Sequence, residues 1–297
     1  MATSAELLAN CNFPPPGTSV NIAVSGGADS VGLTLLAVDA ELRVTLHHVD
    51  HHVRDTSGED AQLVRDLGAR YDVPVIVHDV EVARGGNFEA SARAQRRRVL
   101  PPGALTGHTM DDLAETILIN LLRGAGLDGL SPMVDDPSKP LLHVRRADVR
   151  AFVIASGQPF SDDVTNDDTS LLRNRLRHET LPILNDTSQR DIVPVLARMA
   201  RVVRDDRSWL DDSAATLYER GLGEVDCREL VTWPPALTRR WLRFHLRSAD
   251  TGDGTHPPST DEIERVLEVV RGARVATELS GGRRVHRQHQ HLRVEQI

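Results

Sequence analysis

The stretch AVSGGADS (residues 23–30) places two glycines, an aspartate and a serine between an apolar run and a helical pattern. A strand that turns through Ser25–Gly27 into a helix directs free backbone N–H groups and the positive end of the helix dipole at one point, which suits a phosphate. Glycine permits the close approach of an anion because it has no side chain. Asp29 and Ser30 can cap the helix or, with Mg²⁺ present, hold the metal or a phosphate oxygen.

The same loop lacks the features of two common nucleotide-binding motifs. No GKS or GKT follows it, so the lysine with which the P-loop of kinases and GTPases holds the γ-phosphate is missing. It also lacks GxGxxG, which argues against a dinucleotide. An ordinary βα turn with a capped helix is the alternative without a ligand. The second SGG of the chain, Ser280–Gly282, fits that alternative because arginines and no helix follow it.

Acidic and basic residues further along the chain have spacings that place them on one helix face. Asp112 and Glu115, in GHTMDDLAET, are three residues apart, so both carboxylates can face one cleft; capping of the helix N-terminus is the alternative. Arg173 and Arg177 are four residues apart, as a pair that binds phosphate should be, and salt bridges within the protein are the alternative. A second pair with this spacing is Arg93 and Arg97.

Histidines cluster at the end of a predicted strand, in HHVDHHVR (residues 47–54). A metallohydrolase of the HxHxDH type would need a histidine where Leu46 stands, and no cysteine lies nearby, so a zinc site is disfavoured. Ligands of parallel sheets bind at the carboxyl ends of the strands. We therefore predict that this strand end opens onto a nucleotide, with Arg54 at a phosphate; an exposed surface arginine is the alternative.

Short β-rich runs alternate with helical patterns through the first half of the chain, which predicts βαβ units and a parallel sheet. The SGGADS loop then follows the first strand, and GHTMDD follows the fourth. The strands are expected at residues 20–24, 43–49, 73–80 and 104–106. The helices are expected at residues 30–40, 57–71, 88–100, 111–123 and 147–156.

The sequence pattern changes near residue 190. A long stretch, 193–219, carries apolar residues at helical spacing, and two shorter helices are expected after Pro235 and at 261–271. The tail alternates around a Gly-Gly turn, which predicts a small hairpin. We therefore predict an α/β domain over residues 1–190 and a mainly helical domain over 191–297. Three tryptophans of the second domain are expected in its core: Trp209, Trp233 and Trp241.

Composition bounds the class of protein. With 297 residues, 40% of them hydrophobic, the chain can fill the cores of two domains. It has no apolar run of about 18 residues and no secretion signal, which predicts a cytoplasmic protein. Its two cysteines lie far apart without a CxxC, so neither a disulfide framework nor a thiolate metal site is expected. A net charge of −8 argues against a protein whose whole surface coats nucleic acid, yet the arginines occur in clusters.

The order of these motifs resembles a known family. SGGxDS resembles the loop of the PP-loop ATP pyrophosphatase superfamily, whose members cleave ATP between the α and β phosphates and transfer AMP to an oxygen. Over about residues 20–190, the further segments are similar in order and wording to the tRNA(Ile)-lysidine synthases. Those segments are HHVDHHVR (47–54), FEASARAQRRR (88–98), TGHTMDDLAET (106–116), LLRGAGLDGLSPM (121–133), PFSDDVTNDD (159–168) and LLRNRLRHETLPIL (171–184).

The resemblance implies a fold, a reaction and partners. The fold is a parallel-sheet adenine nucleotide α-hydrolase-like (PP-loop) domain that binds ATP, followed by a helical domain that grips tRNA. In the family, ATP adenylates the C2 oxygen of the wobble cytidine of a tRNA(Ile) with a CAU anticodon, and lysine replaces that oxygen, with release of AMP and pyrophosphate. The implied cofactors and partners are ATP, Mg²⁺, L-lysine and that tRNA. A homodimer stays open, since nothing in the sequence decides the assembly state.

The matching positions imply roles for single residues. Asp112 and Glu115 recognise lysine, and Asp29 binds Mg²⁺. Thr109 stands where the family often has a second histidine, so no role of that imidazole carries over. The implied catalytic residues are Asp29, Asp112, Glu115 and Arg173. The implied ATP site is Ser25, Gly26, Gly27, Ala28, Asp29, Ser30, His48, Asp50, Arg54 and His108. The implied tRNA contacts are Arg93, Arg97, Arg173, Asn174 and Arg177.

Three other functions share the glycine loop. A tRNA 2-thiocytidine thiolase is one, but its chemistry is associated with CxxC pairs or a cluster, and this sequence has no CxxC. A glutamine-dependent amidotransferase or NAD synthetase is another, and it would leave the RNRLRH segment unexplained. A non-catalytic module that senses ATP is the third. It would keep the glycine loop but would have no need of Asp112, Glu115 and the arginine pairs.

Overall fold

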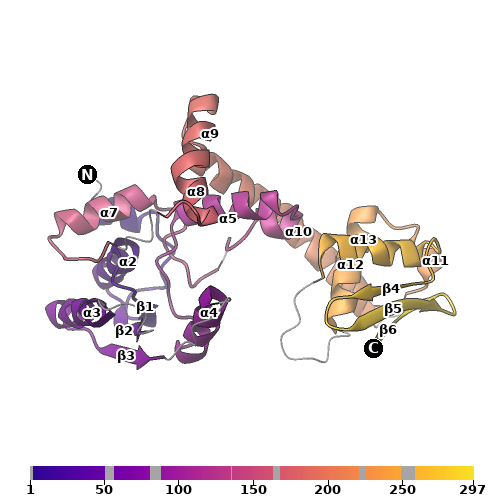
Figure 1. Cartoon of the computed structure of the whole chain (residues 1–297), viewed down its shortest axis with the longest axis horizontal. Coiled ribbons are helices and arrows are strands. Elements are labelled where there is room, and N and C mark those ends of the chain that lie inside the picture. Colours follow the sequence, from indigo (N-terminus) through magenta and orange to yellow (C-terminus); the bar gives the residue numbers. More distant parts are fainter. Residues whose placement is uncertain are drawn as a thin grey trace. The chain divides into compact units, whose positions relative to one another are not determined.

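A parallel sheet forms the centre of the first half of the chain (Figure 1). The computed structural model describes residues 3–50, 57–80, 88–134, 136–162, 168–220, 225–248 and 258–297. The sheet has the strand order β1-β2-β3, and its register sets Ala23 beside His47 and Asp50 beside Asp79. The predicted α/β class and the first three strands are confirmed. The strands are β1 (Ser19–Ala23), β2 (Arg43–Asp50) and β3 (Val75–Asp79).

The predicted fourth strand, 104–106, is wrong in its extent. Within this segment only Leu105 pairs with β1. The Leu105 amide donates to the Asn21 carbonyl at 2.7 Å, and the Leu105 carbonyl accepts from the Ala23 amide at 2.9 Å. The next amide, that of Thr106, donates instead to the Ser138 carbonyl at 2.8 Å, so the ladder stops after one residue. This single bridge is still sufficient to bring the GHTMDD segment beside the end of β1.

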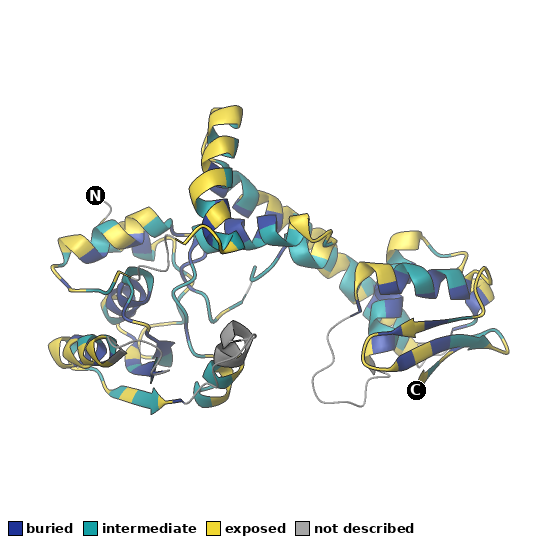
Figure 2. Cartoon of the chain, in the orientation of Figure 1, coloured by how far each residue is buried: buried dark blue, intermediate teal, exposed yellow. Residues whose placement is uncertain are grey.

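Helices surround the sheet and carry most of the polar residues predicted to act. Helix α2 (Ala28–Asp39) is buried along residues 30–37 (Figure 2) and packs against α7 (Arg146–Ala155), where Gly32 leaves room for the side chain of Val149. The helices predicted in this half are confirmed. Besides α2 and α7, these are α3 (Ser57–Tyr71), α4 (Phe88–Val99) and α5 (Met110–Leu122). The structure adds four elements outside the predicted helix ranges: α1 (Ser4–Leu8), α8 (Leu172–Arg175), the π-helical turn η2 (Leu176–Thr180) and α9 (Leu181–Ser188).

The chain divides into two compact units, one of Met1–Arg123 with Ser131–Ala200 and the other of Gly124–Leu130 with Arg201–Ile297. The sequence pattern placed the change near residue 190, whereas this division falls after Ala200 and adds a short earlier segment to the second unit. Helix α10 (Ile192–Arg220) contributes residues to both units. No helix in the described part of the chain is long and apolar enough to cross a membrane.

The second unit combines helices with a three-stranded antiparallel sheet. Helix α13 packs against α12 and the sheet, around a core that includes Leu242, Val266 and Val285. The predicted hairpin is present as β4 and β5, and β6 adds a third strand. The elements are α6 (Leu127–Leu130), α11 (Cys227–Leu230), α12 (Pro235–Ser248), α13 (Thr260–Val270), β4 (Ala276–Leu279), β5 (Arg283–Gln288) and β6 (His291–Gln296).

The tryptophans of this unit differ in their burial. Trp241 is fully buried and Trp233 packs edge-on against it, as predicted. Trp209 has an exposed fraction of 69%, so its prediction as a core residue is wrong. The reason is helical periodicity, because α10 turns Ala214 and Leu217 toward the core and leaves Trp209 on its outer face.

Candidate active site

The SGGADS loop leads from β1 directly into α2, as predicted. Gly26 has a φ of 94°, which glycine adopts readily and other residues avoid. The Ser30 hydroxyl donates to the Gly27 carbonyl at 2.9 Å and accepts from the Ser25 amide at 3.2 Å, which folds the loop over the start of the helix. Gly27 is the N-cap and supplies no capping side chain. The N-terminus of α2 therefore presents backbone amides suited to an anion.

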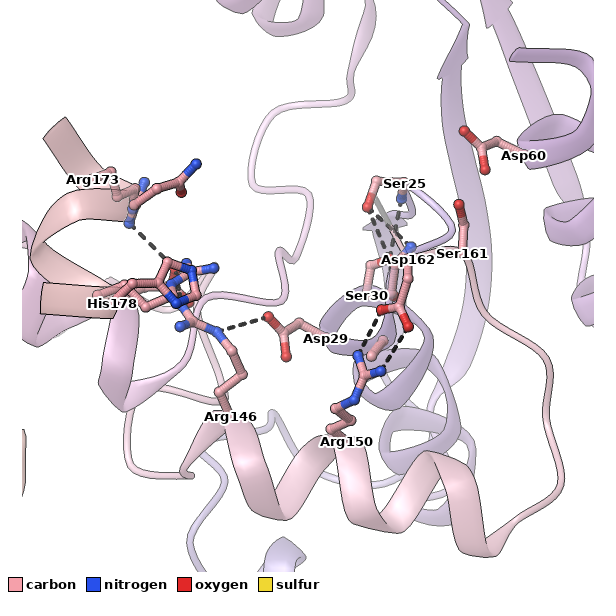
Figure 3. Close-up of a pocket in the computed structure, with 15 residues that line it drawn as sticks. Ser25, Asp29, Ser30, Asp60, Arg146, Arg150, Ser161, Asp162, Arg173 and His178 are labelled. Carbon is pink, nitrogen blue, oxygen red and sulfur yellow. Dashed lines mark hydrogen bonds and ion pairs between the residues drawn. The ribbon is translucent and has the colours of Figure 1, made fainter. Parts of the chain in front are cut away.

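A cavity of about 700 Å³ lies in front of this loop, a volume typical of small-molecule sites. Figure 3 shows loop residues such as Ser25 and Ser30 on one side, with Arg173 and His178 on the other. Asp29 lies between the two groups, and its Oδ2 is 3.4 Å from Arg146 Nε. The lining residues are Ser25, Gly27, Ala28, Asp29, Ser30, Asp60, Asp112, Arg146, Arg150, Ser161, Asp162, Arg173, Asn174, Arg177 and His178.

Glu115 is the most buried charged residue beside this cavity. Its side chain on α5 has no exposed surface, and three guanidinium groups donate to it. Arg146 Nη1 donates to Oε1 at 2.9 Å, Arg173 Nε donates to Oε2 at 2.7 Å, and Arg177 Nε donates to Oε1 at 2.8 Å. A buried carboxylate needs such partners because its desolvation is otherwise costly. The arginines therefore fix α5 against α7, α8 and η2.

Asp112 lies one turn before Glu115 and has two kinds of partner. Its Oδ2 accepts from the Thr109 amide at 2.8 Å and from the Thr109 hydroxyl at 2.9 Å, which caps α5. Its Oδ1 accepts from Arg146 Nη2 at 2.8 Å and from Arg173 Nη2 at 3.3 Å. The capping alternative is thus realised, and Asp112 also lines the cavity, whereas Glu115 does not. Thr109, which is fully buried, has the role of N-cap residue.

The electrostatics separate these carboxylates from Asp29. Burial by itself raises the pKa of Asp112 and Glu115, but the surrounding arginines outweigh it and hold both pKa values below their ordinary range. For Asp29 burial wins over the attraction of Arg146, and its pKa rises to about 6. Asp112 and Glu115 therefore stay ionised and are poor proton acceptors, whereas Asp29 titrates near neutral pH.

Asp29 is also the residue that fits a metal ion. The described residues contain no group of three or more His, Cys, Asp and Glu side chains suited to hold a metal. Mg²⁺ does not need such a group, because it commonly takes one or two carboxylates together with substrate phosphates and water. Asp29 Oδ1 is buried and has no hydrogen-bond partner in the described structure. An oxygen in that position, beside a phosphate loop, matches the donor that Mg²⁺ requires.

The residues predicted for the nucleotide from the second strand lie outside the cavity lining. His48 is buried, and its Nδ1 donates to the Val24 carbonyl at 2.9 Å, so it holds the end of β1. Asp50 is buried at the end of β2 beside Asp79. Arg54 falls outside the described residues. A contact between these residues and the nucleotide stays a prediction.

His108, which was predicted for the ATP site, lies two residues before α5 and is not among the residues that line the cavity, so its contact with ATP stays a prediction. Its Nδ1 and Thr106 Oγ1 form a hydrogen bond of 2.8 Å. Burial, opposed by Asp112 and supported by Lys139 and Arg173, lowers the pKa of His108 to about 4. The imidazole is therefore neutral at pH 7, which suits a hydrogen bond to a nucleotide or to an amine better than an ion pair.

The residues predicted to contact tRNA fall into two groups. Arg173 and Arg177 share one face, as predicted, and in this structure that face binds Glu115. Asn174 is buried, and its Nδ2 donates to the Asp168 carbonyl at 3.0 Å. Arg97 is exposed on α4, and the side chain of Arg93 lies outside the described part. Their contacts with tRNA stay predictions.

The sequence patterns did not single out Arg146, the first residue of α7, or Arg150, one turn further along the same helix. Arg146 contacts Asp29, Asp112 and Glu115, and Arg150 binds Asp162 through two hydrogen bonds of 2.7 Å (Figure 3). A usable signal was present in RRADVR (145–150). Arginine at a helix N-terminus opposes the helix dipole, so acidic partners elsewhere in the fold were to be expected.

Comparisons with known proteins identify the family of this chain. A family model described as a PP-loop domain matches residues 2–184. A tRNA(Ile)-lysidine synthase of Rhodococcus erythropolis is 37% identical over 245 residues, which cover 78% of this chain and 74% of the relative. That of Streptomyces coelicolor is 35% identical over 308 residues, 92% of this chain and 86% of the relative.

A solved structure of a U34-tRNA thiolase from Methanococcus maripaludis is similar with a TM-score of 0.55 and 13% identity, over 68% of this chain and 78% of that one. At such identity the likeness supports the fold alone. Fold, loop and family match together show that the chain belongs to the PP-loop proteins. Within that class it belongs to the tRNA(Ile)-lysidine synthases, as the order of its motifs predicted.

Proposed function

We propose that this chain is an ATP-dependent ligase that converts the wobble cytidine of a tRNA(Ile) with a CAU anticodon into lysidine, releasing AMP and pyrophosphate. Its relatives carry the name of this activity, which we extend to the chain. One observation carries the proposal: the phosphate loop and Asp112 line one cavity, and Glu115 is buried behind it, where it binds the lining residues Arg146, Arg173 and Arg177. The first suits ATP and the second an ammonium group, so both substrates can meet in it.

The loop Ser25–Ser30 would bind the β and γ phosphates of ATP, which depart as pyrophosphate, and leave the α phosphate open to attack by the C2 oxygen of cytidine. That oxygen is a poor leaving group, and AMP makes it a good one. Mg²⁺, held by Asp29, would neutralise charge on the phosphates. Arg146 lies beside Asp29 and holds its Oδ2, which leaves Oδ1 for the metal ion.

Asp112 and Glu115 act in this proposal as binders of lysine. The attacking amine must be uncharged, and with an unperturbed pKa near 10.4 its deprotonation at pH 7 costs about 4.6 kcal/mol. A carboxylate next to that amine would raise this cost, so the two carboxylates are better placed at the α-amino group of lysine. The guanidinium groups around Asp112 and Glu115 would lower the pKa of an amine that approaches these carboxylates, because their positive charge disfavours a second cation.

Lysine has to replace one of the existing guanidinium contacts to reach Glu115. Arg173 is the best candidate, because its side chain is 40% exposed, against 21% for Arg146 and 23% for Arg177. Once released, Arg173 would be available to a phosphate of ATP or tRNA. Binding of the amino acid and placement of a catalytic arginine would thereby be coupled.

The thiolase alternative gains no support from the cysteines. Cys11 and Cys227 are both free, and burial raises the pKa of each thiol, that of Cys11 to about 12. A thiol in this state is a weak nucleophile and a weak metal ligand. The RNA-modifying ligase is therefore preferred to the sulfur-transfer enzyme.

The proposal is tested by the formation of AMP from ATP in the presence of lysine and a tRNA transcript. The ligase requires tRNA for AMP formation, whereas an ATP-hydrolysing module without RNA chemistry would form AMP or ADP without it.

The same preparation, measured by light scattering, decides between a monomer and a homodimer. The family also makes a cytoplasmic location the natural one, since its substrate is tRNA.

A further inference from the structure

Four arginines surround a second cavity, of about 310 Å³, in the second compact unit. Arg207 comes from α10, and the other three follow one face of α12 at spacings of three and four residues. The cavity is distinct from the ATP site, since the two share no lining residue. Its lining consists of Asp128, Arg207, Asp211, Arg240, Arg243, Phe244 and Arg247.

The carboxylates of this cavity do not balance its guanidinium groups. Asp128 accepts from Arg240 Nη1 at 2.8 Å through Oδ1, and its Oδ2 is 3.2 Å from Arg243 Nη1. Asp211 Oδ1 lies 3.0 Å from Arg240 Nε. Two carboxylates thus face four arginines, an excess of two positive charges. Burial and the neighbouring arginines also lower the pKa of Arg243 despite Asp128.

Arg247 stands apart from the other three arginines. Its side chain is exposed, and within the described residues it has no hydrogen bond or ion pair. Arg240, by contrast, is 7% exposed and fully engaged with the two aspartates. A guanidinium left open beside a partly compensated cluster is a ready donor for a further anion, and its planar fork suits phosphate oxygens.

Asp128 belongs to a short segment that reaches the cavity from elsewhere in the chain. The segment, 124–130, is the part of the chain before residue 200 that clusters with the second unit, and two glycines precede Asp128 in it. Its side chain remains 40% exposed, and despite burial Arg240 and Arg243 lower its pKa, so it is ionised at neutral pH. An external anion could therefore compete with the Asp128 carboxylate for Arg240 and Arg243.

We propose that this arginine cavity binds a phosphate group of the tRNA backbone, and that Asp128 is a resident carboxylate that competes for the same guanidinium groups. The identity of the RNA rests on the proposed function. Four guanidinium groups around about 310 Å³ match one phosphodiester with its sugar, held by contacts that read no base. The cavity would then position the body of the tRNA, while the anticodon is modified elsewhere.

The test is the affinity of the full chain for a tRNA transcript as a function of salt. Arg247→Gln weakens binding several-fold and reduces the slope of log K against log salt by about 1. Asp128→Asn tightens binding and steepens the slope, because it removes the competing charge. Arg228→Gln, at an exposed arginine paired with Asp226 in the same unit, is the matched control and leaves both quantities unchanged.

Two results overturn the proposal. One is an Arg247→Gln variant that binds tRNA as tightly as Arg228→Gln does; the other is a folded Asp128→Asn variant that binds more weakly, which would make the cluster a clasp for the 124–130 segment. A thermal melt of each variant verifies folding, and Arg247→Gln decides alone if Asp128→Asn is unstable. Lysine transfer by the wild type is measured in parallel. If the wild type transfers lysine and Arg247→Gln binds tRNA normally, only the phosphate site is refuted. If Arg247→Gln weakens tRNA binding but the wild type transfers no lysine, only the ligase proposal is refuted.

Discussion

Glu115 and Arg177 are joined along both edges of their charged groups. Arg177 Nε donates to Oε1 at 2.8 Å and Nη2 donates to Oε2 at 3.3 Å, while Glu115 has no exposed surface. Arg146 and Arg173 donate to the same carboxylate. One buried charge thus organises three guanidinium groups from α7, α8 and η2, so any test of the proposed role of Glu115 in lysine binding has to account for its role in the fold.

Replacement of Glu115 by glutamine should therefore destabilise the protein. The change leaves three arginines without their shared buried countercharge, for which a loss of about 3–5 kcal/mol in the free energy of unfolding is expected. Urea denaturation measures it. Glu264→Gln is the control, because Glu264 and Arg239 are each more than 40% exposed and their pair should contribute less than about 1 kcal/mol. Similar small losses in both variants would refute the organising role of Glu115.

Asp29→Asn should abolish AMP formation without loss of stability. Burial disfavours the ionised form of Asp29, and its Oδ1 has no partner, so a neutral amide is tolerated by the fold. The amide is, however, a poor ligand for Mg²⁺. We expect an unchanged or higher melting temperature together with loss of AMP formation. The control Asp39→Asn, at the other end of α2, should keep both the melting temperature and AMP formation. An Asp29→Asn enzyme that still forms AMP would show that Asp29 is not needed in the mechanism.

His108 should make stability depend on pH in one direction. Its pKa is about 4 in the folded protein and near 6.5 in the unfolded chain, so between these values the unfolded chain binds the extra proton. The free energy of unfolding then falls as pH drops from about 6.5 to 4, by up to about 3 kcal/mol from this residue. Above about pH 6.5 His108 is neutral in both the folded and the unfolded chain, so its titration no longer changes the free energy of unfolding.

The measurement compares denaturation of the wild type and His108→Asn across that pH range. The comparison is necessary because Asp29, whose pKa is raised to about 6, contributes with the opposite sign between about pH 4 and 6. The difference between the two proteins isolates the histidine. Parallel curves for the two proteins would mean that His108 titrates normally.

Gly107→Ala should push the segment before α5 away from the phosphate loop. A Cβ at Gly107 would lie 2.7 Å from the carbonyl oxygen of Asp29 and 2.8 Å from its carbon, and main-chain atoms cannot yield as a flexible side chain can. We expect a loss of about 1–3 kcal/mol in stability and weaker binding of ATP. Gly58→Ala has nothing within 4 Å of the new methyl group and serves as the control. Equal ATP affinity in the two variants would exclude this close contact.

The loop and the order of elements could be predicted because their signals are local. Gly26 needs its positive φ, and Asp29 opens the helix that follows, all within eight residues of sequence. The role of His48 could not be settled from the sequence, because a strand buried on both faces turns neighbouring side chains to opposite sides and the pattern does not tell which of them a ligand would meet. The fourth strand reduced to Leu105 because Thr106 found a partner in Ser138 instead.

The arginine cluster required the folded chain. Arg146 and Arg177 lie far from Glu115 in sequence, and only the packing of α7 and η2 against α5 brings their charges together. Spacing showed that Arg173 and Arg177 share a face, but not whether that face meets a carboxylate or a phosphate. Under the proposed function both roles would use the same positions, because lysine would exchange with one guanidinium.

The most direct test of the central claim is transfer of radiolabelled lysine to tRNA. Purified protein is incubated with ATP, Mg²⁺, labelled lysine and a tRNA(Ile) transcript bearing a CAU anticodon, beside the same transcript with uridine at the wobble position. The account predicts ATP-dependent label in the first RNA and none in the second. Cleavage of ATP to AMP without any lysine in the CAU transcript would contradict it.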